Sequence, residues 1–437
     1  MKCYLCDKDI EKDLPFCPFC NSPLVSCHNH KCEKYFSPLA NYCNKCSTFI
    51  GDIIVPQHYP SKSLKLSSLL NTDKKPPVNI EVNLLDGLFG MDLLIAFGYL
   101  FVVSESGRIW VLNPKTLKEY ENTSLTQLPL NEVRTNPIIA KYMAKLNDGS
   151  DICKNYLFIA SDDEILRVSI EYKSKDRPIA LSNPKKWDLD GRCLTNPIYL
   201  KNNIIIGTEQ GLISYNIDGE KVWQYNIPNE KIATQLYDDG DKIFFGTHLK
   251  SKICIHAINA SNGKPAWEET YELSSSGIRD IHIEPQSGRL IFFDSEGKLH
   301  NLDVYGEAHY IPQANKISDR PIATGLSDDQ IFVITAIGSI HCLDFFGGMI
   351  KPYLAIGGGG QLFFHSRSAL GANFIVFAAH DGTLLFVRTK NISSRNIEIY
   401  MVTEISVQGE IISTPIMSDG CLYILSEYGS LIKICKS

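Results

Sequence analysis

From residue 78 onward, one pattern recurs: a short apolar strand, a turn, and a second apolar strand. Tyr99–Val103, for example, leads through Gly107 to Ile109–Leu112. A spacing of about 45 residues matches a four-stranded propeller blade, and the lack of 10–15-residue helical patterns argues against a parallel α/β sheet. The sequence therefore predicts an all-β fold, an eight-bladed β-propeller of four-stranded antiparallel blades over residues 78–437, with seven blades as the alternative. The eight copies begin at Tyr99, Tyr156, Asn203, Lys242, Arg289, Gln330, Asn373 and Cys421.

The last copy ends directly after its third strand, at residues 433–435, so its blade lacks a fourth strand. Upstream of the first copy, residues 78–84 read Val-Asn-Ile-Glu-Val-Asn-Leu. This period of two is typical of a half-buried strand, and an unpaired edge in the last blade would invite aggregation. We therefore expect residues 78–84 to form the outermost strand of the last blade and to join the two ends of the propeller.

The start of the chain is rich in cysteine. Dense cysteine without an export signal favours metal over disulfides, and Cys-x2-Cys turns supply two thiolates on one edge of a tetrahedral Zn²⁺ site. From the second ligand onward, the first set recurs 26 positions later. The spacing predicts two structural Zn²⁺ ions, one bound by Cys3, Cys6, Cys17 and Cys20, and one by Cys27, Cys32, Cys43 and Cys46.

These four cysteine pairs resemble a double zinc ribbon, which would cover residues 1–50. Four residues separate Cys27 from Cys32, where two is commoner, so His28 or His30 is an alternative ligand of the second site. Complete four-cysteine shells leave no coordination position for a substrate, which predicts structural sites without catalytic chemistry. Residues 51–77, with four prolines and a Ser- and Lys-rich middle, are expected to form a linker.

The remaining six cysteines stand singly among apolar neighbours. They are Cys153, Cys193, Cys254, Cys342, Cys421 and Cys435. Free cysteine is among the most buried residue types, so all six are expected to be small buried side chains.

A glycine turn followed by tryptophan links the repeat to a known family. It occurs at Asn259 to Gly263 to Trp267 and, in shorter form, at Gly219 and Trp223. Trp187 and Tyr310 stand at comparable places in other copies. The motif resembles that of quinoprotein-like propellers over residues 78–437. The resemblance implies that these tryptophans dock between neighbouring blades.

Net charge and hydropathy limit the classes of function that this chain can have. The net charge is −6 and the pI is near 6.0, which is unlike a nucleic-acid binder. No apolar run approaches the roughly 18 residues of a membrane helix, and the N-terminus lacks the apolar core of a signal peptide, so we expect a cytoplasmic protein without a membrane span. These features favour a non-catalytic protein-interaction scaffold. The resemblance of the ribbon to bacterial adaptor modules suggests a subunit of a bacterial signalling or defence assembly, with an NTPase, a kinase or a von Willebrand-type protein as partner.

Two alternative functions remain at this stage. Nucleic-acid binding through the ribbon would use the linker lysines, although residues 1–50 hold only six lysines, no arginine and five acidic residues. A pyrroloquinoline-quinone (PQQ) dehydrogenase is implied by the family resemblance, but no adjacent cysteine pair and no recognisable calcium site are present. The run of four glycines at 357–360 lacks a following Gly-Lys-Ser/Thr and is expected to be a loop between blades.

Overall fold

The structure is a computed structural model of the 437-residue chain. Every regular element in its described residues is a β-strand. These residues are 25–26, 35–36, 78–120, 125–130, 132–145, 151–171, 179–275, 277–278, 281–284, 288–303, 305–307, 317, 321–326, 330–336, 339–344, 349–355, 369–370, 374–379, 382–388, 399–402, 409–418 and 421–436.

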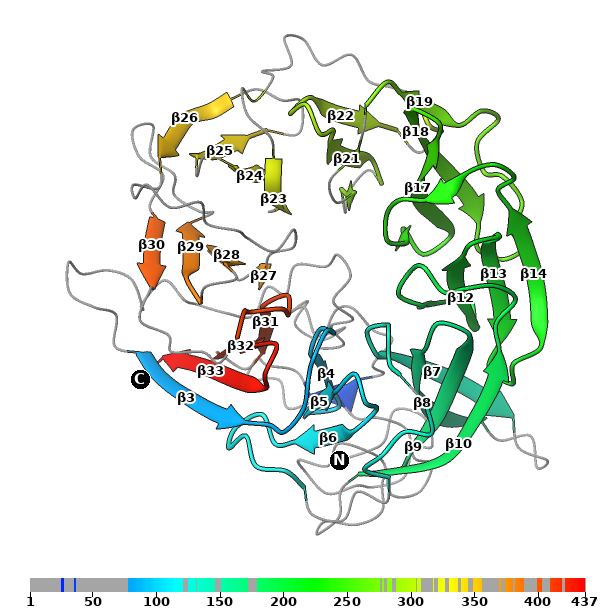
Figure 1. The fold of residues 1–437 in the computed structure, drawn as a ribbon, viewed down its shortest axis with the longest axis vertical. Coiled ribbons are helices and arrows are strands. Elements are labelled where there is room, and N and C mark those ends of the chain that lie inside the picture. The colour runs from blue at the N-terminus through cyan, green and yellow to red at the C-terminus, as the bar shows by residue number, and fades with distance from the viewer. Residues whose placement is uncertain are drawn as a thin grey trace.

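Small antiparallel sheets are arranged in a ring around a centre (Figure 1). In most blades the strands follow one another in chain order; the exceptions are the blade that also contains β3 and the blade in which both β15 and β16 pair with β17. The prediction of an all-β propeller built from small antiparallel blades is confirmed. The described residues form eight such sheets, two of them three-stranded.

The strands of the first four blades are as follows. Blade 1 holds β4 (Leu94–Ala96), β5 (Tyr99–Val103) and β6 (Ile109–Leu112). Blade 2 holds β7 (Ile138–Lys145), β8 (Asp151–Ala160), β9 (Glu164–Glu171) and β10 (Ala180–Asp188). Blade 3 holds β11 (Ile198–Leu200), β12 (Asn203–Thr208), β13 (Gly211–Asn216) and β14 (Lys221–Asn226). Blade 4 holds β15 (Lys231–Ile232), β16 (Tyr237–Asp238), β17 (Lys242–Leu249), β18 (Lys252–Asn259) and β19 (Tyr271–Leu273).

The other four blades complete the ring. Blade 5 holds β20 (His282–Ile283), β21 (Leu290–Phe293) and β22 (Leu299–Leu302). Blade 6 holds β23 (Pro321–Leu326), β24 (Ile331–Thr335), β25 (Ser339–Leu343) and β26 (Met349–Ala355). Blade 7 holds β27 (Ala369–Leu370), β28 (Phe374–Ala378), β29 (Leu384–Arg388) and β30 (Ile399–Val402). Blade 8 holds β31 (Ile416–Ser418), β32 (Cys421–Leu425), β33 (Ser430–Lys436) and β3 (Val78–Leu84).

The core lies between blades rather than inside any one of them. The second strand of a blade is apolar on both faces because a neighbouring blade covers each face, and β5 and β24 are buried at every residue. Phe101 of blade 1, for instance, shares a cluster with Leu157 of blade 2, whereas Phe158 of blade 2 shares one with Ile206 of blade 3. This two-sided burial explains the continuous apolar runs in the sequence.

The ring closes through β3, which pairs antiparallel with β33 from Val78↔Lys436 to Leu84↔Ser430. The strand expected at residues 78–84 is therefore present in the expected place, at the outer edge of the last blade (Figure 1). Its polar side makes the contacts inside the molecule: Asn83 Nδ2 donates to the Leu117 carbonyl at 2.9 Å, and Glu81 forms an ion pair with Lys433 at 3.2 Å. Its apolar side is exposed to solvent, unlike the apolar side of an ordinary half-buried strand.

The tryptophans dock between blades as the family resemblance implies. A Cβ built on Gly219 would lie 2.7 Å from the Trp187 ring, and one on Gly263 would lie 2.6 Å from Trp223. Gly306 covers Trp267 of the preceding blade in the same way. All three glycines have positive φ, so both the backbone conformation and the close approach require glycine. Tyr310 lies outside the described residues.

Blade 1 repeats this turn with a residue that the sequence motif did not reveal. Leu117 holds the glycine position at φ 55°, and its backbone N–H bonds to the Asn113 carbonyl at 2.8 Å. The Leu117 carbonyl accepts a hydrogen bond from Asn83 of β3, whereas each of the three glycines above contacts a tryptophan ring. The junction between blades 8 and 1 is therefore built differently from its neighbours.

Two of the scattered cysteines form a disulfide. Cys421 of β32 and Cys435 of β33 are directly opposite, with a Cα separation of 4.3 Å. The expectation that both are isolated thiols is wrong, because strand pairing joins residues whose spacing in the sequence carries no signal. Cys153, Cys193, Cys254 and Cys342 form no disulfide and are buried, as expected.

We expect the closing strand to be required for a folded ring. A chain lacking residues 1–77 should remain soluble and cooperative in thermal unfolding, whereas one lacking 1–85 should expose the edge of β33 and aggregate. Size-exclusion chromatography and calorimetry measure both outcomes. Equal behaviour of the two truncations would contradict the role of β3.

Candidate functional site

The predicted zinc ligands Cys3, Cys6, Cys17, Cys20, Cys27, Cys32, Cys43 and Cys46 all lie outside the described residues, as do His28, His30 and the four glycines at 357–360. Within the described ranges, no group of three or more His, Cys, Asp or Glu is placed to hold a metal ion. The nearest described element is the hairpin of β1 (Val25–Ser26) and β2 (Tyr35–Phe36), which pair as Val25↔Phe36 and Ser26↔Tyr35.

A buried polar relay joins blades 3 and 4. His256 on β18 is stacked on Phe245, and its Nδ1 lies 3.3 Å from the Tyr225 hydroxyl of the preceding blade. Its Nε2 lies 2.8 Å from Glu230 Oε2 and 2.9 Å from Thr247 Oγ1. Every polar atom of the imidazole is therefore engaged within the protein.

The same arrangement recurs one blade further on. His300 on β22 is stacked on Phe292, its Nδ1 lies 3.2 Å from the Tyr271 hydroxyl, and its Nε2 lies 3.1 Å from Asp294 Oδ2. Burial pushes the pKa of Asp294 upward, but hydrogen bonds from His300 and the Lys298 backbone outweigh it and leave the pKa below its usual value. Hydrogen bonds to an ionised carboxylate stabilise its charged form.

Tyrosine, histidine and carboxylate in a row are groups that catalyse proton transfer, but both imidazoles are almost fully buried. Burial lowers the pKa of His256, although the adjacent Glu230 opposes the shift. The two relays tie the outer strand of one blade to the third strand of the next. The sequence carries one sign of these relays: each histidine follows its tyrosine by about 30 residues, at the same place in the repeat.

Two further side chains have shifted pKa values. Burial lowers the pKa of Lys141 on β7 to about 7 and raises that of Asp238 on β16 to about 6. Shifted values often mark functional sites, but these two residues belong to different blades and share no partner. They reflect local burial at separate interfaces.

A chain of side-chain hydrogen bonds runs between the innermost strands. Asn136 Oδ1 accepts from the Asp92 backbone N–H at 2.9 Å, and Asn196 Oδ1 accepts from the Asn136 N–H at 2.8 Å. Gln235 continues the series, and Asp92 accepts from the Thr414 N–H at 2.6 Å. These hydrogen bonds, two of which end on the Asn residues of Asn136-Pro137 and Asn196-Pro197, thus connect blades 8, 1, 2, 3 and 4 in succession.

The turns between second and third strands form one face of the ring. In blades 1, 2, 3, 5, 6 and 8 a buried Ser, Thr or Asp at the end of the second strand accepts from a backbone N–H further along; Ser104, for example, accepts from Arg108 and Ser426 from Ser430. The same turns are bonded to the segments that lead into neighbouring blades, as Val133 N–H is to the Glu105 carbonyl at 2.8 Å. These turns are therefore rigidly held.

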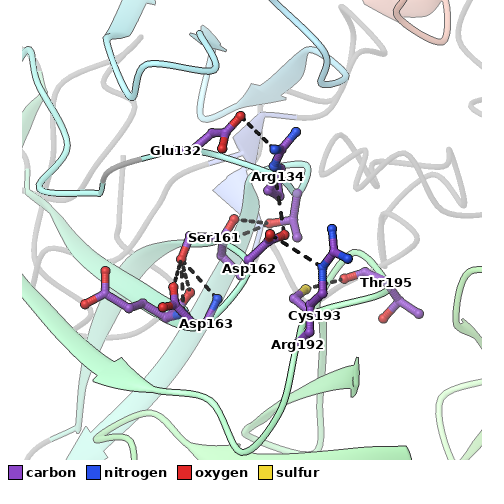
Figure 2. Close-up of polar contacts among 11 residues, drawn as sticks. Glu132, Arg134, Ser161, Asp162, Asp163, Arg192, Cys193 and Thr195 are labelled. Carbon is purple, nitrogen blue, oxygen red and sulfur yellow. Dashed lines mark hydrogen bonds and ion pairs between the residues drawn. The ribbon is translucent and has the colours of Figure 1, made fainter. Parts of the chain in front are cut away.

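An acidic residue follows the anchor in four consecutive blades. We define the acidic face as Glu105, Asp162, Glu209 and Glu427, from blades 1, 2, 3 and 8. Figure 2 shows its centre, where Asp162 lies between Arg134 and Arg192 at 3.9 and 3.5 Å. Glu105 and Glu209 have no ion pair among the described residues, so the negative charge of these two side chains is not compensated by a neighbouring cation.

Comparison with known proteins shows the fold alone. No family model and no curated protein matches this chain. The crystal structure of the computationally designed Ika8 protein aligns over 82% of this chain and 98% of that one, with 13% identity and a TM-score of 0.56. BamB from Moraxella catarrhalis aligns over 82% and 97%, with 14% identity and a TM-score of 0.49. Among the described residues no helix is long and apolar enough to cross a membrane.

We expect His256 to make stability depend on pH. Its folded pKa is lowered, so the unfolded chain takes up a proton first, and stability is lost as pH falls through about 6.5. In His256→Gln, the drop in melting temperature between pH 7.5 and 5.5 should be smaller than in the wild type. The exposed His248→Gln is the control and should keep the wild-type slope. Identical slopes in all three proteins would contradict the prediction.

Proposed function

We propose that this protein is a non-catalytic scaffold that binds protein partners through the acidic face. The observation that supports this function is the set of acidic side chains on anchored turns of four adjacent blades. Rigid turns lose little conformational entropy on binding, and complementary charge steers association. A partner segment rich in lysine and arginine fits this chemistry.

The absence of catalysis is part of the same proposal. The two tyrosine–histidine–carboxylate relays are the described groups most similar to catalytic ones. In each relay the imidazole is buried and is hydrogen-bonded to its own carboxylate. The tryptophan docking on three successive blades supports a distant relationship to quinoprotein-like propellers, but no calcium or quinone ligand was identified in the sequence. We therefore rank the dehydrogenase last.

Nucleic-acid binding is the second candidate, through the ribbon and the linker lysines. Negative charge on the acidic face repels a phosphate backbone, which favours a protein partner. A role as adaptor or recognition subunit of a bacterial signalling or defence assembly, with an NTPase, kinase or von Willebrand-type partner, remains a hypothesis drawn from the pairing of ribbon and propeller.

Location in the cytoplasm remains a prediction. The Cys421–Cys435 disulfide weighs against it, because disulfides are rare in reducing compartments. Thiol labelling of the endogenous chain before lysis distinguishes a reducing from an oxidising compartment. In a reducing compartment both Cys421 and Cys435 are labelled.

The acidic face is tested by charge reversal. Glu105→Lys/Glu209→Lys should lose co-purifying partners by roughly tenfold or more, since several rim charges act together on association. Glu268→Lys/Glu269→Lys introduces the same charge at exposed positions of blade 4 and should retain them. Quantitative mass spectrometry of the full-length protein recovered from its native cells measures the difference. Equal recovery from both variants would refute the proposed face.

We also propose two structural zinc ions in residues 1–50. Supporting this, the β1–β2 hairpin brackets the segment that contains Cys27 and Cys32, as a metal-binding turn would require. Elemental analysis should find two zinc ions per chain, and Cys17→Ser should remove one while leaving the melting transition of the propeller unchanged, because a ribbon and a propeller have separate cores. Less than one zinc per metal-replete chain would contradict the assignment.

A further inference from the structure

The outer strands of the blades differ in what they present to solvent. β10 exposes Lys185 and Lys186, and β14 exposes Lys221 beside a single apolar residue, Val222. Lysine on an edge strand prevents pairing with other chains. Edge strands that have no partner strand usually carry such residues.

β3 has no lysine, and its one charged residue, Glu81, is paired with Lys433. Its exposed side is a row of three apolar residues, Ile80, Val82 and Leu84, whose exposed fractions are 40%, 48% and 59%. Leu88 follows at 51%. Contiguous exposed apolar surface on a sheet edge is typical of an interaction site.

One edge of β3 is used and the other is available. β33 pairs with all seven residues of β3 and is its only strand partner in the described part of the chain. A groove of about 720 Å³ lies between this strand and blade 1, and Val82, Leu84 and Trp110 are among the residues that line it. The strand is therefore accessible along its C-terminal half.

We propose that two copies of this chain associate through β3, which pairs antiparallel with β3 of the second copy. The two-fold axis passes through Val82. In this register Ile80 lies opposite Leu84 of the second copy, so the apolar rows coincide, and Glu81 lies opposite Asn83. The product is one continuous sheet made of two closing blades.

The charge of Glu81 favours a second copy of β3 as the partner and also favours the register centred on Val82. An axis through Glu81 would bring two carboxylates directly opposite each other, which is unfavourable, whereas the axis through Val82 pairs each carboxylate with an amide. The alternating sequence of β3 is thus complementary to itself. A two-fold pairing consumes both free edges and closes the assembly, so an exposed apolar strand does not lead to fibres.

The test measures the mass of the full-length protein by light scattering at roughly 100 µM, where even a micromolar dimer is populated. We expect a dimer for the wild type and a dissociation constant at least about tenfold weaker for Val82→Lys, because the change enters twice in a symmetric interface. Val222→Lys is the matched control: this residue is equally exposed, on β14, and its variant should remain dimeric. A single cooperative melting transition shows that each variant is folded.

Cross-linking tests the register. Val82→Cys should form a covalent dimer under mild oxidation, beyond the level of the wild type with its native cysteines, whereas Ile80→Cys should not, since it lies opposite Leu84. A wild-type monomer, a dimer that survives Val82→Lys, or equal cross-linking of the two cysteine variants would each overturn the proposal. A monomer that gains mass only with another protein would assign β3 to a foreign strand instead.

Discussion

The pairing of β3 with β33 is the interaction on which the rest of this structure depends. Each blade buries its apolar strands only against its two neighbours, so an open ring would leave a blade face and a strand edge exposed to water. β3 comes from the opposite end of the propeller sequence and joins first and last blades through seven residue pairs. Closure therefore makes the stability of all blades interdependent.

Between blades, three kinds of contact repeat with the same geometry: a tryptophan under a positive-φ glycine, a buried histidine between a tyrosine and a carboxylate, and an Asn or Gln that accepts a backbone N–H of the preceding blade. They fix the rotation of one blade against the next. Because the blades are fixed, the turns of the acidic face are held at constant spacing. A rigid frame with variable turns suits the binding of partners.

The two proposed surfaces have opposite chemistry and separate positions. The acidic face lies on turns between second and third strands, whereas β3 lies on the outer rim (Figure 1). Self-association through the rim would leave the turns free. Two copies joined at β3 would then offer two acidic faces, which raises the apparent affinity for a partner that has repeated basic segments.

The sequence alone determined the blade repeat, the apolar strands and the closing strand at residues 78–84, because two-sided burial leaves a local pattern of apolar residues. Only the tertiary structure decided which distant residues meet. The Cys421–Cys435 disulfide, the His256 and His300 relays and Leu117 in a glycine position join residues whose proximity depends on strand register and blade packing. The exposure of the apolar side of β3 also follows from packing, because blade 1 supplies a polar partner for Asn83. The alternation of a strand does not indicate which of its two faces a neighbouring blade will cover.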